Sequence, residues 1–156
     1  MPKILVVDDS PDVLLLCRVH LEYEGYAVET AEDGQQALER IAIECPDLVI
    51  LDIMMPGMDG WDVLAAIRDN PEVAHVPVVM LTARGEGLDE IRGWREGAAG
   101  YITKPFNPAA LSSTVSRALY RSPKEADLVR AEMLGKLEFD LRLTDEAAQQ
   151  AVHDES

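Results

Sequence analysis

Short apolar runs alternate with stretches of helical periodicity along the first 120 residues or so. Ile4 to Val7 is the clearest run, and four consecutive apolar residues are typical of a strand buried on both faces. Between such runs, apolar residues recur every three or four positions, as on one face of a helix. Capping residues support this interpretation: Ser10-Pro11 and Asn107-Pro108 each place a cap and a first-turn proline at a helix start. The strands are expected at residues 4–7, 26–30, 48–51, 77–82 and 100–103.

Five strands alternating with five helices predict an α/β fold with a doubly wound parallel sheet covered on both faces. The last of these helices is expected to run to about Arg121. We therefore predict one domain over residues 1–122, followed by a C-terminal extension over residues 123–156 whose structure the sequence leaves open.

Composition excludes several classes of function. The formal net charge of −15 repels nucleic acid and anionic lipid, and no cluster of Lys or Arg offsets it. No apolar run approaches the roughly 18 residues of a membrane span, and the N-terminus lacks a signal peptide. A cytoplasmic protein with no membrane insertion is expected, with Cys17 and Cys45 as reduced, packed thiols.

Five polar residues follow or end the predicted strands. Parallel strands bring their carboxyl ends to one edge of the sheet, where ligand sites form. Three carboxylates meeting there would bind a divalent cation such as Mg²⁺, and a hydroxyl and an ammonium beside them would receive an anion. This combination indicates phosphoryl-transfer chemistry. The five residues are Asp8, Asp9, Asp52, Thr82 and Lys104.

Taken singly, each of these residues has an ordinary structural explanation. Asp9 can cap a helix, Asp52 can cap a turn, Thr82 can be an ordinary β-branched strand residue, and Lys104 can be a surface lysine. Four such explanations holding together at one sheet edge are less probable than one site. A carboxylate nucleophile at Asp52 would form an acyl phosphate.

The same residues resemble the receiver domain of bacterial two-component response regulators, over about residues 2 to 121. The resemblance rests on Asp8-Asp9, on Asp52 with Met55-Pro56 and Gly60 after it, on Thr82-Ala83 and on Lys104-Pro105-Phe106. It implies a flavodoxin-like receiver fold and a phosphoacceptor that catalyses its own phosphorylation and slow dephosphorylation. A sensor histidine kinase or a histidine phosphotransfer protein would be the donor.

The resemblance also implies a role for each site residue. Asp52 accepts the phosphoryl group, and Mg²⁺, or Mn²⁺ in its place, is the cofactor. Thr82 and Tyr101 would switch a face built from the fourth helix, fifth strand and fifth helix, which a downstream protein binds. The bond between Lys104 and Pro105 would be cis. The implied metal ligands are Asp8, Asp9, Asp52 and the Met54 carbonyl, and the implied phosphoryl contacts are Thr82, Lys104 and the Ala83 N–H.

Met54 and Arg84 occupy two positions that vary in the family and tune how long the phosphoryl group lasts. A bulky apolar residue and a long cationic one are expected to hinder the attacking water, which predicts a relatively persistent phosphorylated state.

The extension carries four basic and nine acidic residues and is too short for a second core. Leu137, Phe139, Leu141 and Leu143 alternate with polar residues, which favours a strand, followed by a short helix from Asp145 to Val152. A helix through Leu134, Leu137 and Leu141 competes with this interpretation, although Gly135 weakens it. Self-association into a homodimer, docking on a partner and the start of a longer protein all stay open.

Other functions are less consistent with the residues. A phosphatase with an aspartyl nucleophile generally needs a second carboxylate two residues later, where this chain has Met54. A flavin-binding electron carrier would need a neutral phosphate loop after the first strand, and Asp8-Asp9 would repel it. No basic recognition helix is visible, so direct DNA binding is not expected. The receiver portion of a larger regulator is the closest rival to a regulator that works alone.

Overall fold

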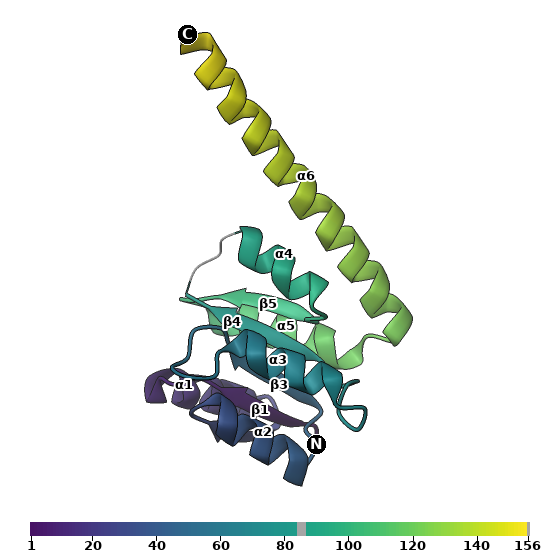
Figure 1. The fold of residues 1–156 in the computed structure, drawn as a ribbon. Coiled ribbons are helices and arrows are strands. Elements are labelled where there is room, and N and C mark those ends of the chain that lie inside the picture. The colour runs from purple at the N-terminus through teal and green to yellow at the C-terminus, as the bar shows by residue number, and fades with distance from the viewer. Residues whose placement is uncertain (84–86, 156) are drawn as a thin grey trace.

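The computed structural model describes residues 1–83 and 87–155, and within these the side chains of residues 1–83 and 89–143. One parallel sheet with the strand order β2-β1-β3-β4-β5 lies between two layers of helices (Figure 1). The predicted doubly wound α/β fold is therefore confirmed. The strands are β1 (Lys3–Val7), β2 (Ala27–Ala31), β3 (Leu48–Asp52), β4 (Val78–Thr82) and β5 (Gly100–Thr103).

The helices follow the strands in the expected order, with one more after the fifth. Ser10 and Asn107 cap helices as predicted, because their side chains accept hydrogen bonds from the N–H groups of Val13 and Ala110. The helices are α1 (Pro11–Tyr23), α2 (Gly34–Ile43), α3 (Gly60–Asp69), α4 (Gly87–Arg95), α5 (Pro108–Tyr120) and α6 (Pro123–Glu155).

Alternation along the strands divides the core into two clusters. On one face of the sheet, residues such as Leu51 and Met80 pack with α2 and α3. On the other face, residues such as Ile50 and Leu81 pack with α1 and α5. The central strands β3 and β4 are buried along their whole length, so their carboxyl ends are held by packing on both sides.

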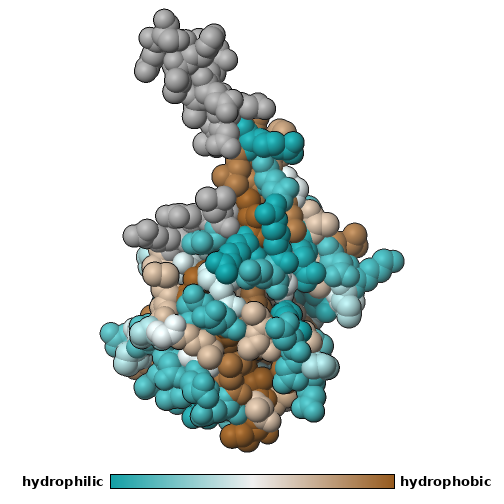
Figure 2. All heavy atoms as spheres, in the orientation of Figure 1, coloured by the Kyte–Doolittle hydropathy of each residue, from teal (hydrophilic) through white to brown (hydrophobic). Residues whose placement is uncertain are grey.

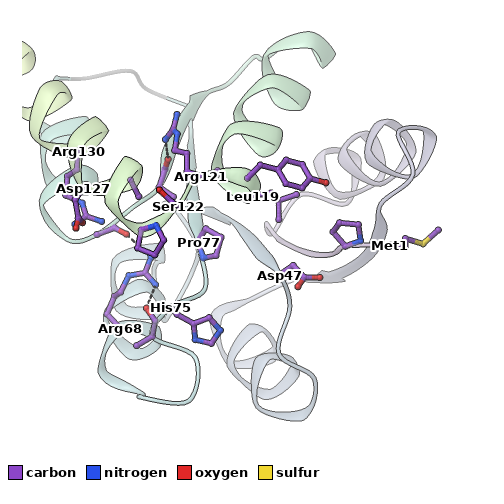
Figure 3. A pocket seen from close by; sticks show the side chains of 18 residues that line it. Met1, Asp47, Arg68, His75, Pro77, Leu119, Arg121, Ser122, Asp127 and Arg130 are labelled. Atoms are coloured by element: carbon purple, nitrogen blue, oxygen red, sulfur yellow. Dashed lines mark hydrogen bonds and ion pairs between the residues drawn. The ribbon is translucent and has the colours of Figure 1, made fainter.

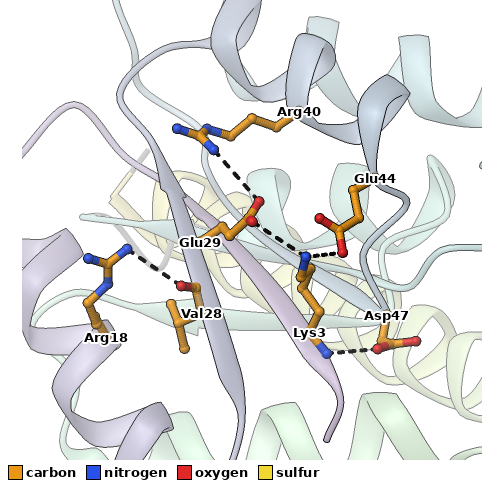
Figure 4. A network of polar contacts seen from close by, with 7 residues as sticks. All are labelled: Lys3, Arg18, Val28, Glu29, Arg40, Glu44 and Asp47. Atoms are coloured by element: carbon orange, nitrogen blue, oxygen red, sulfur yellow. Dashed lines mark hydrogen bonds and ion pairs between the residues drawn. The ribbon is translucent and has the colours of Figure 1, made fainter.

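The first residue of β1 anchors the edge of the sheet opposite to the predicted site (Figure 4). Lys3 pairs with Glu29 on β2 and with Glu44 after α2, and its backbone N–H donates to Asp47 at 2.7 Å. These side chains are partly exposed, so the ion pairs fix geometry more than they add stability. They tie the N-terminal ends of β1, β2 and β3 together.

A groove of about 840 Å³ lies at the same N-terminal edge of the sheet, where α5 passes into α6 (Figure 3). Its lining includes Pro77, Arg68 and Ser122, and none of the predicted site residues. The Arg68 guanidinium donates to the carbonyls of Ala74, Val76 and Gly97 at 2.7 to 3.1 Å, which joins α3 to the turns before β4 and β5. This groove is a structural junction rather than the predicted phosphoryl site.

The strand predicted for residues 137–143 and the separate short helix after it are wrong. Residues Pro123–Glu155 form one helix, α6, which begins with the Ser122 hydroxyl accepting from the N–H of Glu125 at 3.1 Å. A lone strand would leave its backbone groups unpaired, whereas a helix pairs them internally. A Cβ at Gly135 would meet open space, so no packing requires glycine there, and the helix continues in spite of its low helix propensity.

The apolar stripe of α6 also has a partner, which the sequence did not reveal. Helix α6 lies along α4 and then continues beyond the body of the domain (Figure 1). The competing helical interpretation through Leu134, Leu137 and Leu141 is thus the correct one, since all three are partly buried.

The thiols differ from each other in exposure. Cys17 on α1 is fully buried and unpaired, as expected. Cys45 is also unpaired but exposed, because it lies in the short connection between α2 and β3 rather than on a core face. The prediction of a packed thiol is wrong for Cys45. No helix within the described residues is both long and apolar enough for a bilayer crossing.

Candidate functional site

Three carboxylates meet at the carboxyl edge of the sheet. Asp52 is the last residue of β3, and Asp8 and Asp9 directly follow β1, which pairs with β3 in parallel. One carboxylate oxygen of each lies within 4.8 Å of those of the other two. Asp8 and Asp52 are buried, whereas Asp9 is exposed. The structure therefore brings the predicted acidic residues together.

Backbone N–H groups orient the two buried carboxylates. Asp8 Oδ1 accepts from the N–H of Ser10 at 2.9 Å, in the turn that starts α1. Asp52 Oδ1 accepts from the N–H of Met54 at 3.3 Å, in the turn after β3. In both turns, the Asp side chain accepts a hydrogen bond from the backbone N–H of the residue two positions later in the chain. The other oxygen of each carboxylate is left for the site.

Lys104 reaches the same carboxylates from the loop after β5. Its Nζ lies 2.6 Å from Asp8 Oδ2 and 3.6 Å from Asp52 Oδ1. The peptide bond from Lys104 to Pro105 is cis, as the resemblance implied, and the Lys104 N–H donates to the Thr82 carbonyl at 2.5 Å. One ammonium between two buried carboxylates leaves the site with a net negative charge.

Burial and like charge both favour the protonated form of Asp52. Desolvation and then the neighbouring carboxylate of Asp8 raise its pKa, Lys104 and the Met54 N–H partly offset them, and the resulting pKa is about 6. Burial lowers the pKa of Lys104, but its contacts with Asp8 and Asp52 outweigh that effect and the pKa is raised. The Lys104 ammonium therefore stays charged, and the carboxylates of Asp8 and Asp52 share it.

The donor set fits a small hard cation. Three carboxylates within reach of one another are oxygen ligands, and Mg²⁺ characteristically takes a few carboxylates and keeps water in its other positions. Asp8 Oδ2 is buried, and the Lys104 ammonium lies against it. A cation between Asp8, Asp9 and Asp52 would remove the repulsion that raises the Asp52 pKa.

Thr82 and Ala83 flank the cluster on the next strand. Thr82 ends β4, the neighbour of β3, and its side chain is buried. Ala83 follows at the surface. Asp52 pairs in register with Leu81, so Thr82 lies one residue beyond the level of Asp52 at the same edge. Thr82 and Ala83 therefore follow β4 at the same edge of the sheet at which Asp52 ends β3.

Tyr101 lies away from the carboxylates, on β5. It is half-buried, pairs in register with Met80 and packs on the cluster that contains α2 and α3. Its ring approaches Gly93 of α4, because a Cβ placed on Gly93 would meet Tyr101 Cδ2 at 3.6 Å. The predicted switch residue therefore lies between β5 and α4. Arg84 lies outside the described residues.

The loop after Asp52 is held by a close backbone approach at Gly60, a residue of the sequence motif. A Cβ on Gly60 would lie 2.4 Å from the Asp52 carbonyl oxygen and 2.8 Å from Ile53 Cα, so only glycine fits. The Gly60 N–H donates to the Ile53 carbonyl at 2.9 Å. Asp59 and Asp62 form a capping box at the start of α3. Together they fix the path of the chain under Asp52.

Cys17 is the neighbour of the site that sequence reasoning missed. Burial first and the Asp8 carboxylate second raise its pKa, Lys104 partly offsets them, and the resulting pKa is about 12. The thiol of α1 is therefore kept neutral beneath the acidic cluster. The helical spacing of Cys17 predicts a core residue. Only the fold shows that α1 brings this residue near enough to Asp8 for the two groups to interact.

Comparisons with known proteins agree with this geometry. The chain belongs to the response regulator receiver domain family, which matches residues 4–116. It is 39% identical over 140 residues to the phosphate regulon transcriptional regulatory protein PhoB of Rhizobium meliloti, covering 90% of this chain and 61% of that protein. It is 40% identical over 138 residues to the alkaline phosphatase synthesis transcriptional regulatory protein PhoP of Bacillus subtilis, covering 86% and 57%.

A solved structure has the same fold. The chemotaxis protein CheY4 of Vibrio cholerae superposes with a TM-score of 0.73 at 37% identity, covering 76% of this chain and 99% of that one. The chain thus contains a complete counterpart of that structure, whereas it spans about three fifths of the length of the two transcriptional regulators.

Replacing Gly60 by alanine tests the close packing under Asp52. The new methyl group would collide with the backbone at Asp52, so we expect a loss of about 1–3 kcal/mol in the free energy of unfolding, measured with urea. Gly135→Ala is the matched control, because its Cβ meets open space within α6 and should add about 0.5–1 kcal/mol. Equal effects of the two changes would contradict this account of Gly60.

The raised pKa of Asp52 predicts a stability effect that depends on pH in metal-free buffer. A folded-state pKa of about 6 against an ordinary 3.8 means that ionised Asp52 opposes folding above pH 6 and that this cost disappears below pH 3.8. Asp52→Asn should therefore stabilise the protein at pH 7.5 by up to about 3 kcal/mol and have little effect near pH 4. Urea unfolding with a chelator present measures this difference.

Two controls accompany the Asp52→Asn measurement. Asp69→Asn removes an exposed carboxylate at the end of α3 and should shift stability by less than about 0.5 kcal/mol at either pH. Saturating Mg²⁺ should stabilise the wild type more than Asp52→Asn. A gain for Asp52→Asn that is the same at pH 7.5 and pH 4 would exclude a buried ionised carboxylate as its cause.

Proposed function

We propose that Asp52 accepts a phosphoryl group from the phosphohistidine of a sensor histidine kinase or a histidine phosphotransfer protein. A carboxylate oxygen of Asp52 attacks phosphorus, the P–N bond to the donor imidazole breaks, and an acyl phosphate forms. The imidazole takes up a proton from solvent as it leaves. The observation that carries the proposal is the meeting of three carboxylates and one ammonium at the carboxyl edge of a receiver-family sheet.

In this proposal, Asp8, Asp9, Asp52 and the Met54 carbonyl hold Mg²⁺ or Mn²⁺, Asp8 mainly through water. When bound, the cation neutralises charge on the equatorial phosphoryl oxygens. The acidic cluster supports this assignment of the three carboxylates, while the Met54 carbonyl rests on the family resemblance.

Positioning groups complete the transfer site. Lys104 is within reach of both Asp8 and Asp52, so it can turn from Asp8 to the phosphoryl oxygens as negative charge gathers on Asp52. The Thr82 hydroxyl and the Ala83 N–H donate to the remaining oxygens. All three groups come from strand ends that are already held in place, so the site needs little rearrangement for the chemical step.

The chain is proposed to act as a phosphoacceptor that promotes its own phosphorylation and slow dephosphorylation. A phosphatase with an aspartyl nucleophile is the alternative in another class, but the position two residues after Asp52 carries Met54, whose side chain is 73% exposed and has no acid or base. A flavin carrier would place a phosphate against Asp8 and Asp9, whose charge opposes it.

Phosphorylation is proposed to alter the face formed by α4, β5 and α5. Thr82 reorients toward the phosphoryl group, and Tyr101 rotates into the space between β5 and α4 that this movement leaves. The contact between Tyr101 and Gly93 supports a link between that rotation and the position of α4. A downstream protein would bind the two forms with different affinity.

We consider two ways in which the whole protein could produce its output. The chain could signal through protein contacts alone, as its formal charge of −15 and lack of a basic patch favour. It could also be the receiver portion of a larger regulator, in keeping with the longer relatives that it matches. Neither kind requires this part of the chain to bind DNA.

Phosphorylation of the intact chain tests the central proposal. Incubation with Mg²⁺ and acetyl phosphate should add one phosphoryl group to the mass of the wild type and none to Asp52→Asn. Asp69→Asn is the matched control and should be modified like the wild type, because its carboxylate is exposed and lies on α3. An unmodified wild type, under conditions that modify another receiver domain, would overturn the proposal.

Met54 provides a test of the predicted persistence. Its exposed side chain follows the Asp52 turn, where it would shield the acyl phosphate from water. Met54→Asn should shorten the half-life of the phosphorylated protein several-fold, because an amide can orient water where a thioether cannot. The loss of the added mass with time after removal of acetyl phosphate measures this. A half-life equal to that of the wild type would count against the shielding role.

A further inference from the structure

Helix α4 has an apolar face that does not pack on the sheet. Gly93 faces the sheet, since a Cβ there would meet Tyr101 and Met80. Ile91 lies two residues away, which places it on the opposite side of the helix, and Trp94 lies nearer to that side than to the sheet. Both are nevertheless buried, at 5% and 6% exposure. Among the described residues, the two core clusters on the sheet include neither of them.

Helix α6 covers this outer face of α4. The two helices lie side by side (Figure 1), and α4 packs more extensively on α6 than on β5. Figure 2 shows apolar residues gathered where α6 meets the domain. The partly buried residues of α6 recur every three or four positions, as on one face of a helix. They include Val129, Met133, Leu134, Leu137 and Leu141.

Charged pairs lie along the same contact. Arg95 on α4 forms an ion pair with Glu138 on α6, and Lys136 lowers the pKa of Glu90, which burial raises overall. These charges are partly exposed and add little stability, but they fix how the two helices align. The exposed apolar residues Phe139 and Leu143 lie on the outer side of α6, so the contact uses one defined face of the helix.

We propose that the outer face of α4 is an interaction surface whose occupant in the unphosphorylated protein is α6 of the same chain, and that phosphorylation of Asp52 releases α6. The proposal rests on the proposed phosphorylation of Asp52. Residues 126–141 are then a latch that covers Ile91 and Trp94 until the signal arrives.

The connection from the site to the latch is short. Thr82 lies five residues before Gly87, the first residue of α4, so a movement of Thr82 toward a phosphoryl group acts on the start of that helix. On the side of α3, α4 is held by Arg92, whose guanidinium lies 4.4 Å from the centroid of the Trp61 ring. Because α4 packs lightly on β5, a shift of α4 must be taken up at its contact with α6.

Coupling of this kind is reciprocal. If phosphorylation weakens the docking of α6 by a given factor, then loss of docking favours phosphorylation by up to that same factor. Two tests follow, one that observes α6 when Asp52 is phosphorylated and one that observes phosphorylation when α6 is disturbed.

The first test measures hydrogen exchange in residues 126–141 of the intact chain, with Mg²⁺ alone and with Mg²⁺ and acetyl phosphate. An undocked helix frays, so exchange there should become about tenfold faster or more when the phosphoryl group is present. In a Trp61→Phe variant, the emission of Trp94 should shift to longer wavelength in parallel. Unchanged exchange and emission in a protein whose mass shows the added phosphoryl group would overturn the latch alone.

The second test compares two changes on opposite sides of one turn of α6. Leu137→Gln removes a partly buried side chain from the docked face, whereas Phe139→Gln removes one that is 54% exposed on the outer side. Both replacements keep a good helix former. Leu137→Gln should raise the fraction phosphorylated at limiting acetyl phosphate, on the order of fivefold in the equilibrium ratio, and Phe139→Gln should leave it unchanged.

Three other outcomes would contradict the docking of α6 on α4 or its release. Equal effects of Leu137→Gln and Phe139→Gln would contradict a specific contact with α4. A red shift of Trp94 emission on dilution of the unphosphorylated protein would mean that a second copy supplies the helix, which would overturn docking within one chain. If no phosphoryl group is added to the wild type, the proposed function fails and the release of α6 fails with it.

Discussion

The crowding of negative charge at the carboxyl edge of the sheet is the constraint on which the rest of the structure depends. Asp8 and Asp52 are both buried, and one ammonium, that of Lys104, lies against the two of them. Buried charge is tolerated only when it is paired, and here the pairing is incomplete. The site therefore gains stability from any cation or proton that reaches it, which is the property that a magnesium-dependent phosphoacceptor needs.

The fold holds this unfavourable cluster in place through its most rigid parts. Strands β1 and β3 are central in the sheet and packed by helices on both faces, so their ends cannot separate to relieve the repulsion. The turns after Asp8 and Asp52 and the close approach at Gly60 fix the backbone around them. The repulsion is thus retained at the site instead of being relieved by a shift of the strands.

Much of the fold and the candidate site could be predicted from the sequence because both depend on local patterns. Buried apolar runs such as Leu48 to Leu51 are typical of central strands in a parallel sheet. A carboxylate at the end of such a run lies at the carboxyl edge of the sheet, where ligand sites form. Caps such as Asn107 fix a helix start within a few residues. The order of the strands then brings together residues that are up to about a hundred positions apart.

What the sequence could not reveal depends on contacts between distant segments. The neighbourhood of Cys17 and Asp8 arises from the packing of α1 on the sheet, and no local signal encodes it. The alternation from Leu137 to Leu143 satisfies a strand as well as a helix when only a short window is considered. The helix is favoured because its stripe meets the outer face of α4, a partner that becomes visible only in three dimensions.

The arrangement of α4 is the physical basis of the structural effect that we propose for phosphorylation of Asp52. Helices that are buried in a core resist displacement because their packing has one arrangement, whereas α4 is held between contacts of different strength. It packs lightly on β5 and more extensively on α6, which follows α5 along the chain. A helix in this position can exchange one set of neighbours for another at small cost. The helix that follows Thr82 along the chain is therefore also one that packs only lightly on its neighbouring strand.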